Sequence, residues 1–118
     1  MVQQPGRRIA VVTDSAACVP RALARELGIH VVPLQLTLGG RTYLDGVDIT
    51  PTQFYRRLRE STTPPTTSQP TPGSFMEVYR QVGQQAEGIV SVHVGEDLST
   101  TLEGARLAGE EASPVPIR

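Results

Sequence analysis

Three short apolar runs, rich in β-branched residues, are separated along this chain by segments with helical periodicity. The runs cover residues 8–13, 29–36 and 89–94. Their length and their Val and Ile content favour strands buried on both faces, and strands that alternate with helices form parallel sheets. We therefore predict an α/β fold in which the three strands are parallel neighbours in one sheet, with helices on both faces.

Four segments are predicted to be helical, over residues 20–27, 51–60, 72–86 and 98–112. Two of them have clear start signals, because Thr50-Pro51 and Thr71-Pro72 each place a capping hydroxyl before a proline. Pro33 interrupts the second apolar run, where we expect a bend or an edge position. Gly39-Gly40 predicts a hairpin turn into residues 41–44.

Composition excludes several classes of protein. The 118 residues suffice for one domain, which we place at 8–118 after a flexible tail at 1–7. The net charge of −1 is spread without blocks, which does not suggest nucleic-acid binding. No apolar run reaches the roughly 18 residues of a membrane span. With a single cysteine, these features predict a soluble cytoplasmic protein.

Residues 61–73 contain only Ser, Thr, Pro, Gln and Gly, so neither helix nor strand is predicted there. One interpretation is a solvated low-complexity linker. The other is a proline-stiffened loop, ordered against the domain, whose hydroxyls at Thr67 and Ser68 donate to a carboxylate or phosphate. Both interpretations remain open on composition alone.

Three further places carry polar groups near the expected ends of strands, where parallel sheets bind ligands. Thr13, Asp14 and Ser15 follow the first strand and form either a simple turn or part of a ligand site. Ser99 and Thr100 open the last helix, as a cap or as part of an anion site. His93 is either a satisfied core histidine or a ligand-binding residue. No catalytic residue, metal site or cofactor is predicted.

Taken in order, several segments resemble those of the DegV family, in its N-terminal part. The most specific is Thr66-Thr-Ser-Gln-Pro-Thr-Pro-Gly73, and the set spans residues 8–118. The others are Ile9–Ser15, Gly28–Leu34, Tyr43–Ile49, Phe54-Tyr55, Phe75 with Tyr79, Val92–Val94, and Leu98-Ser99.

The resemblance implies a non-enzymatic protein that holds a long-chain fatty acid and presents it to a separate fatty-acid kinase subunit. The carboxylate-binding Thr and Ser of the family fall on Thr67 and Ser99. Two alternatives are a phosphoryl-transfer enzyme related to dihydroxyacetone kinases and an inactive truncated remnant. Residues 13–15, 61–73 and 95–101 contain no Lys or Arg, which favours a singly charged headgroup over a polyphosphate.

The resemblance also implies that the chain lacks a C-terminal domain. We therefore expect an exposed apolar surface, marginal stability, and dimerisation, aggregation or dependence on lipid.

Overall fold

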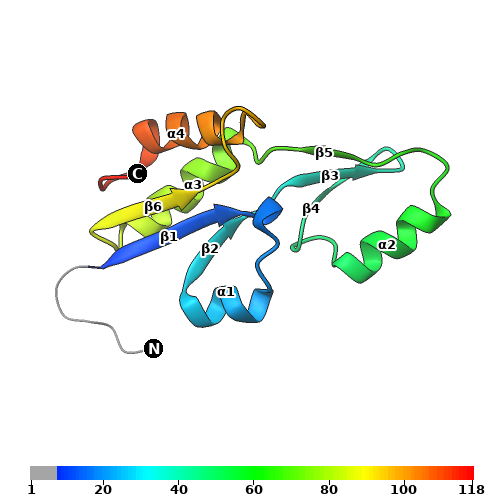
Figure 1. Cartoon of the computed structure of the whole chain (residues 1–118), viewed down its shortest axis with the longest axis horizontal. Helices are drawn as coiled ribbons and strands as arrows, with labels where there is room; N and C mark the ends of the chain where they lie inside the picture. The colour runs from blue at the N-terminus through cyan, green and yellow to red at the C-terminus, as the bar shows by residue number, and fades with distance from the viewer. Residues whose placement is uncertain (1–7) are drawn as a thin grey trace.

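The computed structural model of this chain describes residues 8–118, and the tail expected at residues 1–7 lies outside them. Two three-stranded sheets lie side by side (Figure 1). The first contains β1 (Ile9–Asp14), β2 (Ile29–Val32) and β6 (Gly88–Val92), and the second contains β3 (Gln35–Leu38), β4 (Arg41–Leu44) and β5 (Thr66–Ser68). The helices are α1 (Arg21–Leu27), α2 (Pro51–Glu60), α3 (Pro72–Gly83) and α4 (Thr101–Ala112), and a single 3-10 turn, η1 (Ser15–Ala17), follows β1.

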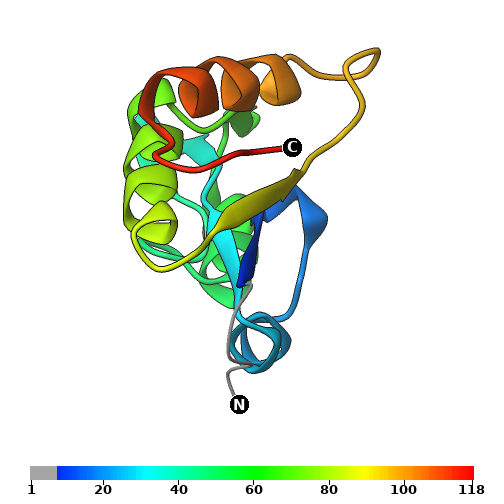
Figure 2. The ribbon, with the colours of Figure 1, turned by 90° about the vertical axis from the view of Figure 1, so that its left-hand side faces the viewer.

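The first sheet confirms the predicted parallel arrangement. Its order is β2-β1-β6, and both β2 and β6 run parallel to β1. The chain crosses from β1 to β2 through α1, and later from β2 back past β1 to β6 through a connection that contains α3. These crossovers run in opposite directions across the sheet, so right-handed connections place α1 and α3 on opposite faces. Figure 2 shows α3 and α4 together beside the sheet, with α1 apart from them. The chain therefore has the expected α/β fold.

The main core lies between α3 and the first sheet. Phe75 and Tyr79 of α3 are 1% and 0% exposed, and they belong to one apolar cluster with Val12, Val32 and Ile89 of the three strands. α4 packs against α3 through small residues, with Ala105 and Ala108 in the same cluster. The periodicity of residues 72–86 thus identified the face that the sheet covers.

The opposite face of the sheet is largely open. Ile9, Val90 and Val92 alternate with core residues along their strands, and they are 56%, 41% and 55% exposed. Leu23 and Leu27 of α1 are also exposed. This is the kind of surface expected from the sequence, whereas the association and marginal stability linked to it stay predictions.

The second sheet corrects two expectations. Residues 29–36 were expected to form one strand, but only β2 joins the parallel sheet, and after Pro33 the chain continues as β3 in an antiparallel sheet. Residues 61–73 were expected to lack regular structure, yet Thr66–Ser68 forms β5. The physical reason is that β3 offers an unpaired edge, which supplies backbone partners to a segment of low intrinsic strand propensity.

The predicted helix starts and the predicted hairpin turn are confirmed. The Thr50 hydroxyl accepts from the Gln53 backbone amide, and the Gln53 side-chain oxygen accepts from the Thr50 backbone amide, which completes a capping box. Thr71 caps α3, and Gly39-Gly40 turns β3 into β4. Residues 116–118 pair in parallel with β6 through backbone bonds to Ile89 and Ser91. Within residues 8–118, no helix is long and apolar enough to cross a membrane.

Gly83 provides a test of the α3 packing. A Cβ at this position would lie 2.5 Å from the ring of Pro114, so Gly83→Ala should lower the free energy of unfolding by about 1–3 kcal/mol through overpacking. At Gly104 of α4 a Cβ would meet only a side-chain atom at 3.9 Å, so Gly104→Ala should be neutral or stabilising by up to about 1 kcal/mol. Urea denaturation of both variants measures the difference, and equal effects would contradict this packing.

Candidate functional site

The carboxyl ends of β1 and β6 carry a buried chain of polar side chains. The Asp14 carboxylate lies 2.5 Å from Nδ1 of His93, and Nε2 of His93 lies 2.6 Å from the Ser91 hydroxyl. Ser91 in turn lies 2.7 Å from the hydroxyl of Tyr79 on α3. One donor order that satisfies these atoms has Tyr79 donating to Ser91, Ser91 to Nε2 of His93, and Nδ1 of His93 to Asp14.

Burial makes this chain rigid. Asp14 is 2% exposed, and its second oxygen accepts from the Ala16 amide at the entry to η1. The His93 ring also packs edge-on against Phe75, with centroids 5.4 Å apart. An unpaired polar group lowers the stability of the fold more in this buried setting than at the surface. The four side chains therefore keep the one geometry in which all of them are hydrogen-bonded.

The order Asp14, His93, Ser91 is that of a hydrolytic triad, but its surroundings differ. Ser91 is partly buried, and its hydroxyl is engaged by His93 on one side and Tyr79 on the other. A nucleophile needs open access to a substrate carbon and nearby oxyanion donors. The arrangement therefore acts as a structural brace between β1, β6 and α3. Within residues 8–118, no group of three or more His, Cys, Asp or Glu could hold a metal ion.

Thr13 and Ser15 are also engaged inside the protein. The Thr13 hydroxyl donates to the carbonyl of Val92 at 2.7 Å, which joins the ends of β1 and β6. The Ser15 hydroxyl accepts from the Leu34 amide at 2.9 Å, just after the bend at Pro33. The Thr13 hydroxyl uses its proton in this bond, whereas the Ser15 hydroxyl accepts and keeps its own proton. Both residues shape the edge of the sheet.

The hydroxyls of the β5 segment are disposed differently. Thr67 and Ser68 are both exposed, and neither side chain has a hydrogen-bond partner within the part of the chain that the structure describes. β5 is extended, so the two side chains point to opposite faces. Thr67 lies opposite Leu36, on the face that also carries Tyr43, whereas Ser68 lies opposite Gln35.

The start of α4 meets this segment. The Thr100 hydroxyl donates to Oε1 of Gln69 at 2.6 Å, across 31 positions of sequence. Ser99 lies one residue before Thr100, the N-cap of α4, and its hydroxyl accepts from the Thr101 amide at 3.1 Å. It also lies 2.9 Å from the Thr101 hydroxyl, and when Thr101 donates in that pair the Ser99 proton can be donated elsewhere. Pro70, next to Gln69, is fully buried. The structure thus brings the two predicted anion-binding segments into contact, and the convergence of Thr67 and Ser99 themselves stays a prediction.

Sequence reasoning missed three participants: Tyr79 and Ser91 in the buried chain, and Gln69 in the contact with Thr100. A weak signal existed for Ser91, because it precedes His93 by two positions and strand alternation puts both on one face. The two long-range hydrogen bonds at Tyr79 and Gln69 had no such signal.

The chain matches the family model described as an uncharacterised protein of the DegV family, over residues 8–118. It is 41% identical over 113 residues to a DegV domain-containing protein of Streptomyces coelicolor, covering 95% of this chain and 40% of that protein. It is 38% identical over 104 residues to one of Listeria monocytogenes, covering 87% of this chain and 37% of that protein. The chain therefore spans well under half the length of these relatives.

Solved structures of DegV family proteins are also similar to this chain. DegV of Bacillus subtilis, named as a fatty acid binding protein, superposes with a TM-score of 0.89 at 29% identity, over 96% of this chain and 40% of that one. A DegV family protein of Thermus thermophilus, described by its fatty acid binding, gives 0.80 at 40% identity, over 94% of this chain and 40% of its own. A stearic acid-binding protein of Eubacterium ventriosum gives 0.80 at 27% identity, over 93% and 40%.

The buried chain makes a prediction for stability. Asp14→Asn replaces an acceptor with an amide N–H that faces another donor, so the free energy of unfolding should fall by on the order of 2 kcal/mol. The matched control is Asp97→Asn, because Asp97 is exposed and should change stability by less than about 0.5 kcal/mol. Chemical denaturation of the two variants decides, and equal stabilities would show that the carboxylate is not needed in this brace.

The ionisation of Tyr79 makes the stability of this brace depend on pH. Burial raises the pKa of Tyr79 above its ordinary value of 10.0, although the hydrogen bond to Ser91 opposes part of the rise. The unfolded chain therefore loses this proton at a lower pH than the folded protein, so the contribution to stability is intact below pH 10.0 and is lost as the pH rises above it. In an ultraviolet titration of the three tyrosines, one should ionise late, and that late step should vanish in Tyr79→Phe. A late step that persists in the variant would contradict the assignment.

Proposed function

The chain belongs to the DegV family, and on that premise we propose that it is a non-enzymatic lipid-binding protein that holds a long-chain fatty acid. In this proposal the hydroxyls of Thr67 and Ser99 donate to the carboxylate. The observation that carries it is the contact between Gln69 and Thr100, because it brings the hydroxyl-rich segment of β5 to the start of α4.

The chemistry of the two segments supports a carboxylate. Residues 61–73 and 95–101 contain no Lys or Arg, so an anion there would be held by hydrogen bonds without an opposite charge. A carboxylate carries one charge over two acceptor oxygens, and each hydroxyl supplies one donor. A polyphosphate would need cations that these segments lack. The start of α4 adds its unpaired backbone amides and the positive end of its dipole.

The acyl chain requires an apolar wall beside the headgroup. Val92, Val94 and Leu98 are 55%, 40% and 84% exposed, and they precede Ser99 in the chain. They provide apolar surface close in sequence to the proposed headgroup donor, which is the arrangement an amphiphilic ligand needs. In this proposal the lipid covers part of that surface.

The four inward-bonded residues take a supporting part in the proposal. Thr13, Asp14, Ser15 and His93 hold the edge of the first sheet, and His93 is fixed between Asp14 and Ser91. Thr67 and Ser68 are exposed, so a carboxylate bound there would stay accessible from outside. We propose on this basis that the acid is presented to a fatty-acid kinase subunit.

Extraction of the purified protein into organic solvent, followed by mass spectrometry, should recover long-chain fatty acid. In titrations with a fluorescent fatty acid, Thr67→Ala and Ser99→Ala should each weaken binding by roughly tenfold, because each removes a hydrogen bond to a charged group. The control is Thr66→Ala, since the alternation of β5 directs Thr66 to the face opposite Thr67. Absence of lipid together with unchanged binding in both variants would reject the proposal.

A further inference from the structure

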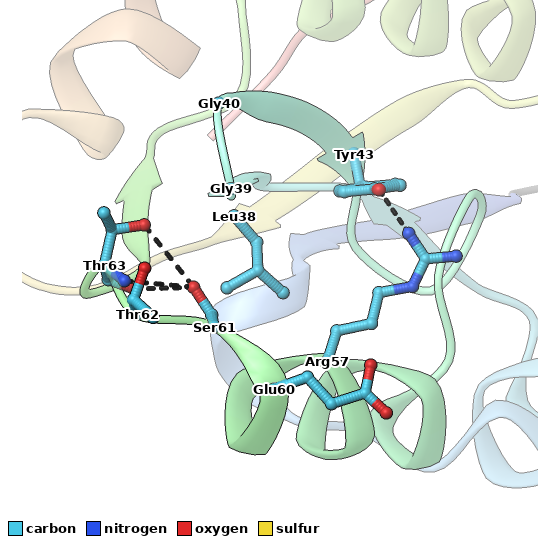
Figure 3. Close-up of a pocket in the computed structure, with 9 residues that line it drawn as sticks. All are labelled: Leu38, Gly39, Gly40, Tyr43, Arg57, Glu60, Ser61, Thr62 and Thr63. Atoms are coloured by element: carbon cyan, nitrogen blue, oxygen red, sulfur yellow. Dashed lines mark hydrogen bonds between the residues drawn. The ribbon is translucent and has the colours of Figure 1, made fainter.

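A cavity of about 500 Å³ lies between the C-terminal half of α2 and the β3–β4 hairpin (Figure 3). It is separate from the residues proposed to hold the fatty-acid headgroup. Leu38 and Tyr43 form its apolar floor, Arg57 closes one side, and Ser61 and Thr63 close the other. It is a shallow depression that is largely open to solvent, and its volume is in the range of small-molecule sites, which are typically a few hundred Å³.

One wall carries the guanidinium of Arg57, which forms no ion pair within residues 8–118, and Arg41 lies nearby without lining the cavity. Arg57 donates a hydrogen bond to the Tyr43 hydroxyl, and its guanidinium lies 5.0 Å from the centre of the Tyr43 ring. Arg41 lies over the same ring at 5.4 Å. Within residues 8–118, no carboxylate lies within 4.0 Å of either guanidinium. Arg57 has five N–H donors, and its side chain is held at the cavity with most of them unused.

The facing wall is held by a tight turn. The Ser61 hydroxyl donates to the carbonyl of Thr63 at 2.9 Å, and the Thr63 amide approaches the same hydroxyl at 3.3 Å. Above it, Gly39 and Gly40 adopt φ angles of +60° and +78°, and a Cβ at either position would meet nothing within 4 Å. The cavity thus has polar groups on two sides and stays open at the hairpin.

Glu60 restricts the charge of a ligand. Its carboxylate also lines the cavity, and α2 ends there with the negative end of its dipole. Both disfavour a multiply charged anion. A single negative charge directed at Arg57 is compatible with them, because the guanidinium can bind a carboxylate through two parallel N–H groups.

We propose that this cavity binds a small monocarboxylate with an apolar body. The carboxylate pairs with Arg57, and the apolar part lies on Leu38 and the ring of Tyr43. Ser61 and Thr63 contribute polar contacts on the opposite side. The site is independent of the fatty-acid proposal, since the two share no residue.

Phenylacetate is a suitable probe, and 2-phenylethanol is its uncharged counterpart. In NMR titrations of the 118-residue chain, phenylacetate should produce saturable shifts at the amides of Gly39, Gly40, Ser61 and Thr63. The alcohol should bind at least about tenfold more weakly, because it lacks the charge-assisted pair with Arg57.

Arg57→Gln should weaken phenylacetate binding about tenfold, whereas Arg56→Gln should leave it within about twofold. Arg56 is the matched control, because it is exposed on the same helix and does not line the cavity. Arg57→Lys keeps the positive charge but loses the paired N–H groups of the guanidinium, so a loss of phenylacetate affinity between those of the other two variants is expected. This variant also tests the proposal if Arg57→Gln fails to fold. Absence of saturable shifts, equal binding of the alcohol, or unchanged binding in Arg57→Gln would overturn the proposal. Tighter binding of phenyl phosphate would overturn the assignment to a monocarboxylate.

Discussion

The pair formed by Asp14 and His93 is the interaction on which the centre of this protein depends. A carboxylate that is only 2% exposed requires hydrogen-bond donors, and it takes one from the His93 ring and one from the Ala16 amide. The ring is fixed in turn by Ser91, which α3 reaches through Tyr79. One chain of hydrogen bonds therefore joins the C-terminal end of β1, the C-terminal end of β6 and the buried face of α3. Each hydrogen bond orients the next side chain.

The bend after β2 gives the molecule its second sheet. The Leu34 amide donates to Ser15, and the Leu34 carbonyl accepts from Asp45 after β4. These bonds fix the point at which the chain leaves the parallel sheet and begins the antiparallel one. Because β5 pairs with β3, the segment that follows α2 returns along the second sheet toward α3 (Figure 1). The meeting of Gln69 with Thr100 is a consequence of this route.

Much of the fold could be predicted because its signals are local. The cap at Thr50 with Gln53, the cap at Thr71 before Pro72, and the left-handed Gly28 after α1 all depend on neighbours within a few residues. The candidate site was predictable only in part. Ser99 has a local signal as a helix cap, whereas the strand at Thr66–Ser68 exists because β3 offers an edge to it. Its own composition of Ser, Thr and Pro would not produce a strand.

The sequence by itself determined the parallel strands, the helices between them and the apolar face of α3, because periodicity and capping act over short distances. The tertiary structure alone decided which polar groups are available to a ligand. Asp14 and His93 bond each other inside the protein, whereas the exposed Thr67 side chain has no hydrogen-bond partner within residues 8–118, although each of the three carries a polar side chain. The physical reason is that a buried polar group must find its partner wherever the fold places one, here across 79 positions from Asp14 to His93. Local sequence carries no record of such a partner.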